Sequence, residues 1–156
     1  MELSCPDADA TFALGRALGT VLEPGDFVGL RGQLGAGKTL FARGVAAGAG
    51  VPLEDVSSPT YSIIQTYRGS RLALHHADLY RLFTEADLFS TGYFDLLEGQ
   101  GAFLVEWIDR IPGAAPDDAL HIALEVTSLE SRRLRAASSG LRSQALLGRW
   151  VTALLR

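Results

Sequence analysis

The apolar positions of this chain follow helical spacing near both of its ends. In the first segment four apolar residues recur at intervals of three and four: Leu14, Ala17, Leu18 and Val21. Asp7 or Asp9 can cap this helix, and Pro24-Gly25 would end it. The last segment repeats the pattern with Leu146, Trp150, Ala153 and Leu154. Helices are also predicted over residues 38–48 and, as one or two short helices, over 84–97.

Strand patterns lie between these helices. "FVGLRG" (27–32) is a short apolar strand that runs into glycine, and "AFLVEW" (102–107) is a continuous apolar run, typical of a strand buried on both faces. "TYSIIQTY" (60–67) and "RLALHHAD" (71–78) predict a hairpin through Arg68-Gly69-Ser70. Residues 120–126 alternate, which predicts one covered face and pairing with "RRLRAA". Together the elements predict one α/β domain over residues 1–156, with a mixed, mainly parallel sheet flanked by helices.

Length and composition limit the class of protein. The 156 residues suit one domain with a real core, and 47% hydrophobic and 21% charged residues are typical of globular proteins. No apolar run approaches the ~20 residues that span a bilayer, and the N-terminus lacks the basic-then-apolar order of a signal peptide. The single cysteine, Cys5, cannot form an internal disulfide. We therefore expect a cytoplasmic protein that does not contact membranes.

The net charge of −4 conceals an asymmetry along the chain. Residues 1–130 contain 8 basic and 18 acidic residues (8 − 18 = −10), whereas residues 131–156 contain six arginines and no acid (+6). The simpler interpretation is an amphipathic element with a solvated basic face. The alternative is that Arg132, Arg133 and Arg135 contact nucleotide, tRNA or an acidic partner.

The most informative stretch follows the first apolar strand and opens the second helix. There Gly32, Gly37, Lys38 and Thr39 fit G-x-x-x-x-G-K-[ST], the phosphate-binding loop, in the strand-loop-helix context that the motif requires. Lys38 is the only lysine among 14 basic residues. Glycines let the backbone N–H groups surround phosphate oxygens, Lys38 would reach the β- and γ-phosphates, and Thr39 would offer its hydroxyl to Mg²⁺.

A phosphate loop needs an acidic group near the metal, usually at the end of a neighbouring strand. Glu106 ends "AFLVE" and Asp78 ends "RLALHHAD", so either can be a metal ligand or can orient an attacking water. Asp26 begins its strand, at the end away from the loop. His76 shares the strand face of Asp78, where a hydrogen-bonded core histidine is more common than a catalyst. Trp107 is interpreted as a packing residue that can also contact a partner.

Several motifs in order give the chain a family resemblance. "GQLGAGKT", "SSPTYSIIQTY", "HHADLYRL" and "LVEW" make the sequence resemble the TsaE (YjeE) family, bacterial ATPases required for threonylcarbamoyladenosine formation on tRNA. The resemblance implies that the ATP-binding residues are Gln33, Leu34, Gly35, Ala36, Gly37, Lys38, Thr39 and Leu40. It further implies that Thr39 and Glu106 hold Mg²⁺, that Asp78 assists hydrolysis together with Lys38, that Thr60 lies in a switch-like loop and that Thr11 lies near the base.

The resemblance also implies a function and partners. Such a protein would bind the complex of TsaB and TsaD, contact tRNA only through that complex, and hydrolyse ATP, weakly alone, to reset the complex between cycles. A small-molecule kinase of the phosphate-loop class is the main alternative, with Arg68, Arg71 or Arg81 as lid residues. A GTPase switch and a module that binds ATP without cleaving it are further alternatives.

Overall fold

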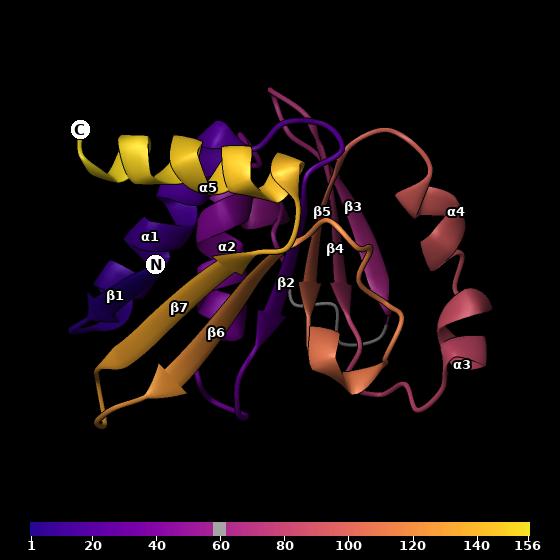
Figure 1. Cartoon of the computed structure of the whole chain (residues 1–156), viewed down its shortest axis with the longest axis horizontal. Helices are drawn as coiled ribbons and strands as arrows, with labels where there is room; N and C mark the ends of the chain where they lie inside the picture. Colours follow the sequence, from indigo (N-terminus) through magenta and orange to yellow (C-terminus); the bar gives the residue numbers. More distant parts are fainter. Residues whose placement is uncertain (58–61) are drawn as a thin grey trace.

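The fold alternates helices with strands, as the hydrophobic pattern predicts. The computed structural model describes residues 1–57 and 62–156 (Figure 1). The strands are β1 (Glu2–Cys5), β2 (Phe27–Arg31), β3 (Ile64–Arg68), β4 (Ala73–Asp78), β5 (Ala102–Glu106), β6 (Leu120–Val126) and β7 (Arg132–Ser138). The α-helices are α1 (Ala8–Val21), α2 (Lys38–Gly48), α3 (Glu85–Phe89), α4 (Tyr93–Leu97) and α5 (Leu141–Leu154). Short 3₁₀ helices, η1 and η2, cover Leu53–Asp55 and Ile108–Arg110.

The strands form one mixed sheet in the order β1-β7-β6-β2-β5-β4-β3. In the centre, β2 pairs in parallel with β5 and β6, and β4 pairs in parallel with β5. The edges are antiparallel, through the predicted β3–β4 hairpin on one side and β6–β7–β1 on the other. The carboxyl ends of the parallel strands therefore meet at one edge of the sheet, the lower edge in Figure 1.

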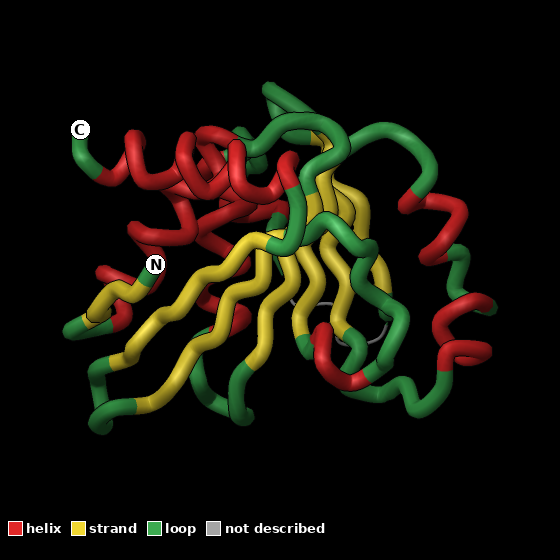
Figure 2. The backbone as a smooth tube through the Cα atoms, in the orientation of Figure 1, coloured by secondary structure: helices red, strands yellow, loops and turns green. Residues whose placement is uncertain are grey.

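Helices cover the two faces of the sheet unequally. One apolar cluster joins the sheet to α1, α2 and α5, and its largest side chains include Phe41 and Trp150. A second cluster lies on the other face, where Leu88 of α3 and Tyr93 of α4 pack near Phe103 of β5. Figure 2 shows the sheet between the two groups of helices. None of the helices in the described part of the chain is long and apolar enough to cross a membrane.

Helices α1 and α2 cross unusually closely, because glycines line their contact. A Cβ built on Gly15 would lie 2.3 Å from the carbonyl oxygen of Phe41, and one on Gly44 would lie 2.3 Å from that of Phe12. Gly19 and Gly48 make equivalent approaches one turn further along. Since α2 begins at the phosphate loop, this crossing brings the start of α1, including Thr11, beside that loop.

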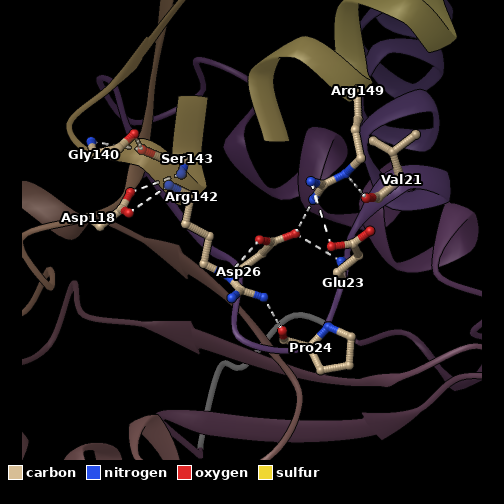
Figure 3. A network of polar contacts seen from close by, with 9 residues as sticks. All are labelled: Val21, Glu23, Pro24, Asp26, Asp118, Gly140, Arg142, Ser143 and Arg149. Carbon is tan, nitrogen blue, oxygen red and sulfur yellow. Dashed lines mark hydrogen bonds and ion pairs between the residues drawn. The ribbon is translucent and has the colours of Figure 1, made fainter. Parts of the chain in front are cut away.

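The acidic residue Asp26, just before β2, anchors helix α5. Its carboxylate is 1% exposed and accepts hydrogen bonds from Arg142 Nε at 3.1 Å, Arg149 Nη2 at 2.8 Å and the Glu23 backbone N–H at 2.8 Å (Figure 3). At the start of α5, Asp118 accepts from the backbone N–H groups of Arg142 and Ser143, so a residue 24 positions earlier caps the helix. Two of the C-terminal arginines thus bind a buried acid instead of forming a solvated basic face.

The observed element boundaries confirm one prediction and differ from others. The first helix has Asp7 as its cap and ends at Val21, before Pro24-Gly25. The strand predicted from residue 60 is seen from Ile64; Thr60 and the rest of 58–61 lie outside the described residues. Strand β1 was not predicted, because four residues at a sheet edge carry little periodic signal.

Candidate functional site

The phosphate-loop motif connects the end of β2 to the start of α2. Gly37 precedes the helix with φ of 100°, a left-handed conformation that glycine adopts without strain. A Cβ on Gly32 would lie 2.5 Å from the carbonyl oxygen of Leu124, so only glycine fits between the loop and β6. The local sequence therefore folds into a strand, a tight loop and a helix whose free N–H groups face the loop, as an anion site requires.

Lys38 is buried at the base of this loop, with 5% of its surface exposed. Its ammonium donates to the carbonyl oxygens of Gly32 at 2.6 Å and Gln33 at 2.9 Å. Burial lowers the pKa of Lys38, while the negative charges of Glu106, Asp109 and Asp78 act in the opposite direction. The loop carbonyls hold the ammonium in place beside these carboxylates.

Glu106 is the acidic residue in direct contact with the phosphate loop. Thr39 Oγ1 donates to Glu106 Oε1 at 2.9 Å, and the other carboxylate oxygen lies 2.6 Å from His76 Nε2. Both Glu106 and His76 are 1% exposed. The contact with Thr39 joins the end of β5 to the first turn of α2, which is the arrangement expected when parallel strands end at one edge of a sheet.

Asp78 lies beside Glu106 but is held differently. The two residues are register partners across β4 and β5. Asp78 Oδ1 accepts from the backbone N–H of Tyr80 at 2.9 Å. Burial raises the pKa of Asp78, the Tyr80 N–H lowers it, and the nearby charge of Glu106 raises it again. The net effect is a pKa of Asp78 above its ordinary value, mainly because of burial. Asp78 is half-buried at the rim of the site, whereas Glu106 is enclosed.

Trp107 adopts a strained conformation directly after Glu106. Its φ is 59°, the one positive φ at a non-glycine residue among the described residues. This conformation directs the indole ring over Lys38, with the ammonium 4.0 Å from the ring centroid, and against the Tyr80 ring at 4.8 Å. Strain of this kind concentrates at functional sites.

An open cavity of about 440 Å³ joins these groups. Its lining combines the loop, the two carboxylates and the aromatic pair: Leu34, Gly35, Gly37, Lys38, Thr39, Leu40, Asp78, Tyr80, Glu106 and Trp107. The structure thus brings together all the predicted catalytic and metal residues, although they come from α2, β4 and β5. Asp26 lies at the opposite end of β2, as the sequence analysis expected.

A second cavity of about 390 Å³ adjoins the loop on its other side. Thr11, Gly37 and Leu40 line it together with the first turn of α1 and the β6–β7 connection. Arg132 closes this side: its Nη2 donates to the carbonyl oxygen of Gly35 at 3.2 Å, and its Nη1 donates to Ser128 and Ser131 carbonyls at 3.1 and 2.9 Å. Arg133 and Arg135 instead pair with Glu2.

The donor set fits a nucleotide with a magnesium ion. Mg²⁺ prefers oxygen ligands, and it usually takes one or two from the protein and the rest from phosphates and water. Thr39 Oγ1 and Glu106 Oε1 would supply such ligands beside the loop. Within residues 1–57 and 62–156 no group of three or more His, Cys, Asp and Glu side chains is placed to hold a metal ion. A metal here would therefore depend on the nucleotide to complete its ligands.

Two of the arginines considered for a kinase lid lie far from this cavity. Arg68 pairs with Ala73 at the end of the β3–β4 hairpin opposite to Asp78. Arg71 donates to the carbonyl oxygens of Gly19 and Leu22 at the end of α1. Neither residue faces the phosphate loop, and only Arg81, three residues after Asp78, follows a strand end at the site.

Sequence reasoning did not identify two contacts of the site. The sequence favours packing or contact with a partner for Trp107, whereas in the structure its ring covers Lys38. The sequence gives Arg132, Arg133 and Arg135 the same possible contacts. Of these three, Arg132 is the one whose side chain reaches the phosphate loop in the structure. For the contact of Trp107 with Lys38, the sequence does offer a signal, because Trp107 directly follows the glutamate that ends a strand. No local signal separates Arg132 from its neighbour Arg133.

The mixed α/β sheet, the loop between β2 and α2 and the Lys38–Thr39–Glu106 cluster define a P-loop nucleotide-binding protein. The family can be stated as well. Residues 5–134 match the family model described as "Threonylcarbamoyl adenosine biosynthesis protein TsaE", and the chain belongs to the TsaE family. This confirms the resemblance carried by the sequence motifs.

Individual relatives agree with this assignment. The chain is 37% identical over 130 residues to the tRNA threonylcarbamoyladenosine biosynthesis protein TsaE of Treponema pallidum, covering 83% of this chain and 95% of that protein. It is 35% identical over 138 residues to TsaE of Bacillus subtilis, covering 88% of this chain and 85% of that protein. The crystal structure of Bacillus subtilis YdiB superposes with a TM-score of 0.81 at 28% identity, covering 97% of this chain and 94% of that one.

Proposed function

We propose that this protein binds ATP with Mg²⁺ at the phosphate loop and hydrolyses it, and that hydrolysis drives turnover of the TsaB–TsaD complex in threonylcarbamoyladenosine modification of tRNA. The observation that carries the proposal is the contact between Thr39 and Glu106 beside the buried Lys38, in a chain of the TsaE family. The proposal places the protein in the cytoplasm, with tRNA contacted through the complex.

Each residue has a definite task in this proposal. The backbone N–H groups of residues 33–40 and the start of α2 bind the phosphates, and the Lys38 ammonium neutralises part of their charge. Thr39 and Glu106 supply the protein oxygens for Mg²⁺, which would offset the charge that develops on the phosphates during transfer. Asp78, at the rim, orients the attacking water. Thr11 and Arg132 lie beside the cavity that would take the nucleoside.

The open shape of the site favours stimulation by a partner. The cavity that contains Lys38 and Asp78 is open to solvent, and the exposed side chain of Leu34 lies at its rim. A partner that covers this opening would exclude water and strengthen every electrostatic interaction inside. Hydrolysis by the isolated protein would then be slow.

The proposal is tested by measuring phosphate release and modified tRNA together. Adding purified TsaB, TsaD and tRNA should raise the rate of ATP hydrolysis, and each TsaB–TsaD complex should modify several tRNA molecules. Lys38→Ala should remove both effects while the protein stays folded by circular dichroism. Equal hydrolysis with and without the partners, together with no change in tRNA modification, would refute the proposal. Phosphate transferred to an added small molecule would instead support the kinase alternative.

A further inference from the structure

The carboxylate of Glu106 is held at both of its oxygens, and the two donors come from different parts of the fold. Thr39 Oγ1 donates to Oε1 at 2.9 Å, and His76 Nε2 lies 2.6 Å from Oε2. Because a carboxylate oxygen accepts, the imidazole donates through Nε2. Thr39 belongs to the phosphate loop, whereas His76 belongs to β4. Within residues 1–57 and 62–156, the hydrogen bond between His76 and the site is therefore the one to Glu106.

The strand register explains how His76 reaches this carboxylate. His76 lies opposite Leu104 on β5, and Glu106 is two residues further along that strand. The two side chains are thus diagonal neighbours on one face of the sheet, within reach of long side chains. Both are 1% exposed, so water cannot replace the imidazole as a donor without opening the core. The ring also packs near Tyr67, with centroids 6.1 Å apart.

A buried carboxylate with only one hydrogen-bond donor would be less stable and less firmly oriented. An ion or polar group deprived of its buried partner is strongly destabilised, so it rotates or draws in water. If Glu106 rotated, Oε1 would leave Thr39 Oγ1, and the two protein oxygens proposed as metal ligands would separate. Mutation of a residue that orients a metal ligand in this way typically lowers metal affinity by 10- to 100-fold.

We propose that His76 is a positioning residue: its hydrogen bond to Oε2 of Glu106 keeps Oε1 directed at Thr39 and thereby raises the contribution of Mg²⁺ to nucleotide binding. The inference rests on the proposed function, because it concerns the same nucleotide site. It goes beyond that function by assigning a role to a residue that touches neither nucleotide nor metal.

The neighbouring histidine provides a matched control. His75 is also buried, at 5% exposure, but its side chain is on the other face of the sheet, beside Phe103. Its Nδ1 lies 2.9 Å from Thr66 Oγ1, and its Nε2 lies 2.8 Å from the carbonyl oxygen of Gln100. Replacing His75 removes the same ring from the same strand, with two lost hydrogen bonds, while Glu106 keeps its donors.

The experiment measures the ratio of two dissociation constants by calorimetry. A non-hydrolysable ATP analogue is titrated into the full chain in excess Mg²⁺ and again in EDTA. The dissociation constant in EDTA divided by that in Mg²⁺ gives the contribution of Mg²⁺ to binding. We expect His76→Ala to lower this ratio about tenfold relative to the wild type. His76→Gln, whose amide nitrogen can take the place of Nε2, should recover most of the ratio. His75→Ala should leave the ratio unchanged even where it lowers the melting temperature.

Three results would overturn the inference while leaving the proposed function in place. One is a folded His76→Ala variant with the wild-type ratio, and another is an equal loss in His75→Ala. Where His76→Ala does not fold, His76→Asn replaces it, because the shorter amide cannot reach Glu106. The third result is an equal ratio in His76→Asn and His76→Gln. A wild-type protein that binds no analogue in either buffer would overturn the proposed function, and this inference with it.

Discussion

The ammonium nitrogen of Lys38 lies 4.0 Å from the centroid of the Trp107 ring, so the aromatic face covers the charge that the phosphate loop presents. A cation at this distance from an indole face is attracted to it. Trp107 reaches the position through a left-handed backbone conformation, which costs about 1–3 kcal/mol at a non-glycine residue. The residue after the proposed metal ligand therefore lines the same cavity as the phosphate loop.

This contact predicts a fluorescence signal. Phosphate bound beside Lys38 would change the charge next to the Trp107 ring, so ATP should change the emission of this tryptophan. The other tryptophan, Trp150, is buried against α1 and donates to the carbonyl of Leu14, away from the loop. A Trp150→Phe variant should retain the response, and Trp107→Phe should lose it. Constant Trp107 emission at ATP concentrations that saturate the site by calorimetry would contradict the prediction.

Arg132 and Arg133 should differ in their effect on ATP affinity. Arg132 joins the β6–β7 connection to Gly35 of the phosphate loop, whereas Arg133 lies near Glu2 and Glu125 at 3.5 and 3.7 Å. We expect Arg132→Ala to raise the ATP dissociation constant by about 3- to 10-fold. This increase corresponds to the free energy of roughly one hydrogen bond. Arg133→Ala should leave it within experimental error. Calorimetric titration measures both, and equal effects of the two variants would reject the assignment.

The close crossing of α1 and α2 should make Gly15→Ala destabilising. Alanine normally stabilises a helix relative to glycine, but here its Cβ would meet a backbone oxygen at 2.3 Å. We expect the free energy of unfolding to fall by about 1–3 kcal/mol, the usual result of overpacking. Gly148→Ala in α5 is the control, because its Cβ would have nothing within 4 Å. It should raise the free energy of unfolding by about 0.5–1 kcal/mol. Urea denaturation that shows the same sign for both variants would disprove this explanation.

The cap that Asp118 provides for α5 should make stability depend on pH. The Ser143 hydroxyl and backbone N–H, with the Arg142 N–H, hold the pKa of Asp118 below its ordinary value of 3.8. A depressed folded-state pKa means that the stabilisation is complete above pH 3.8 and is lost as the pH falls through the folded-state pKa. The destabilisation caused by Asp118→Ala should therefore be largest near neutral pH and shrink in acid.

Denaturation at a series of pH values measures this effect. An Asp118→Asn variant has no group that titrates at this position, so its stability should fall less steeply in acid than that of the wild type. Parallel curves for the wild type and Asp118→Asn would show that this carboxylate does not contribute.

The contiguous part of the site could be predicted from the sequence. The loop from Gly32 to Thr39 lies within one stretch, so its spacing, the preceding strand and the following helix can all be read locally. Helix α2 has the predicted bounds, residues 38–48. Glu106 and Asp78 were identified because parallel strands end at a common edge, where their last residues meet.

The sequence by itself thus determined the elements, the α/β class and the phosphate loop, since hydrophobic period and motif spacing are properties of neighbouring residues. Only the tertiary structure decided that His76 meets Glu106, that Arg132 and not Arg133 meets the loop, and that Arg142 and Arg149 bind Asp26. These contacts join residues 30 to 123 positions apart. They depend on strand register and on the direction of each side chain, which one-dimensional spacing does not contain.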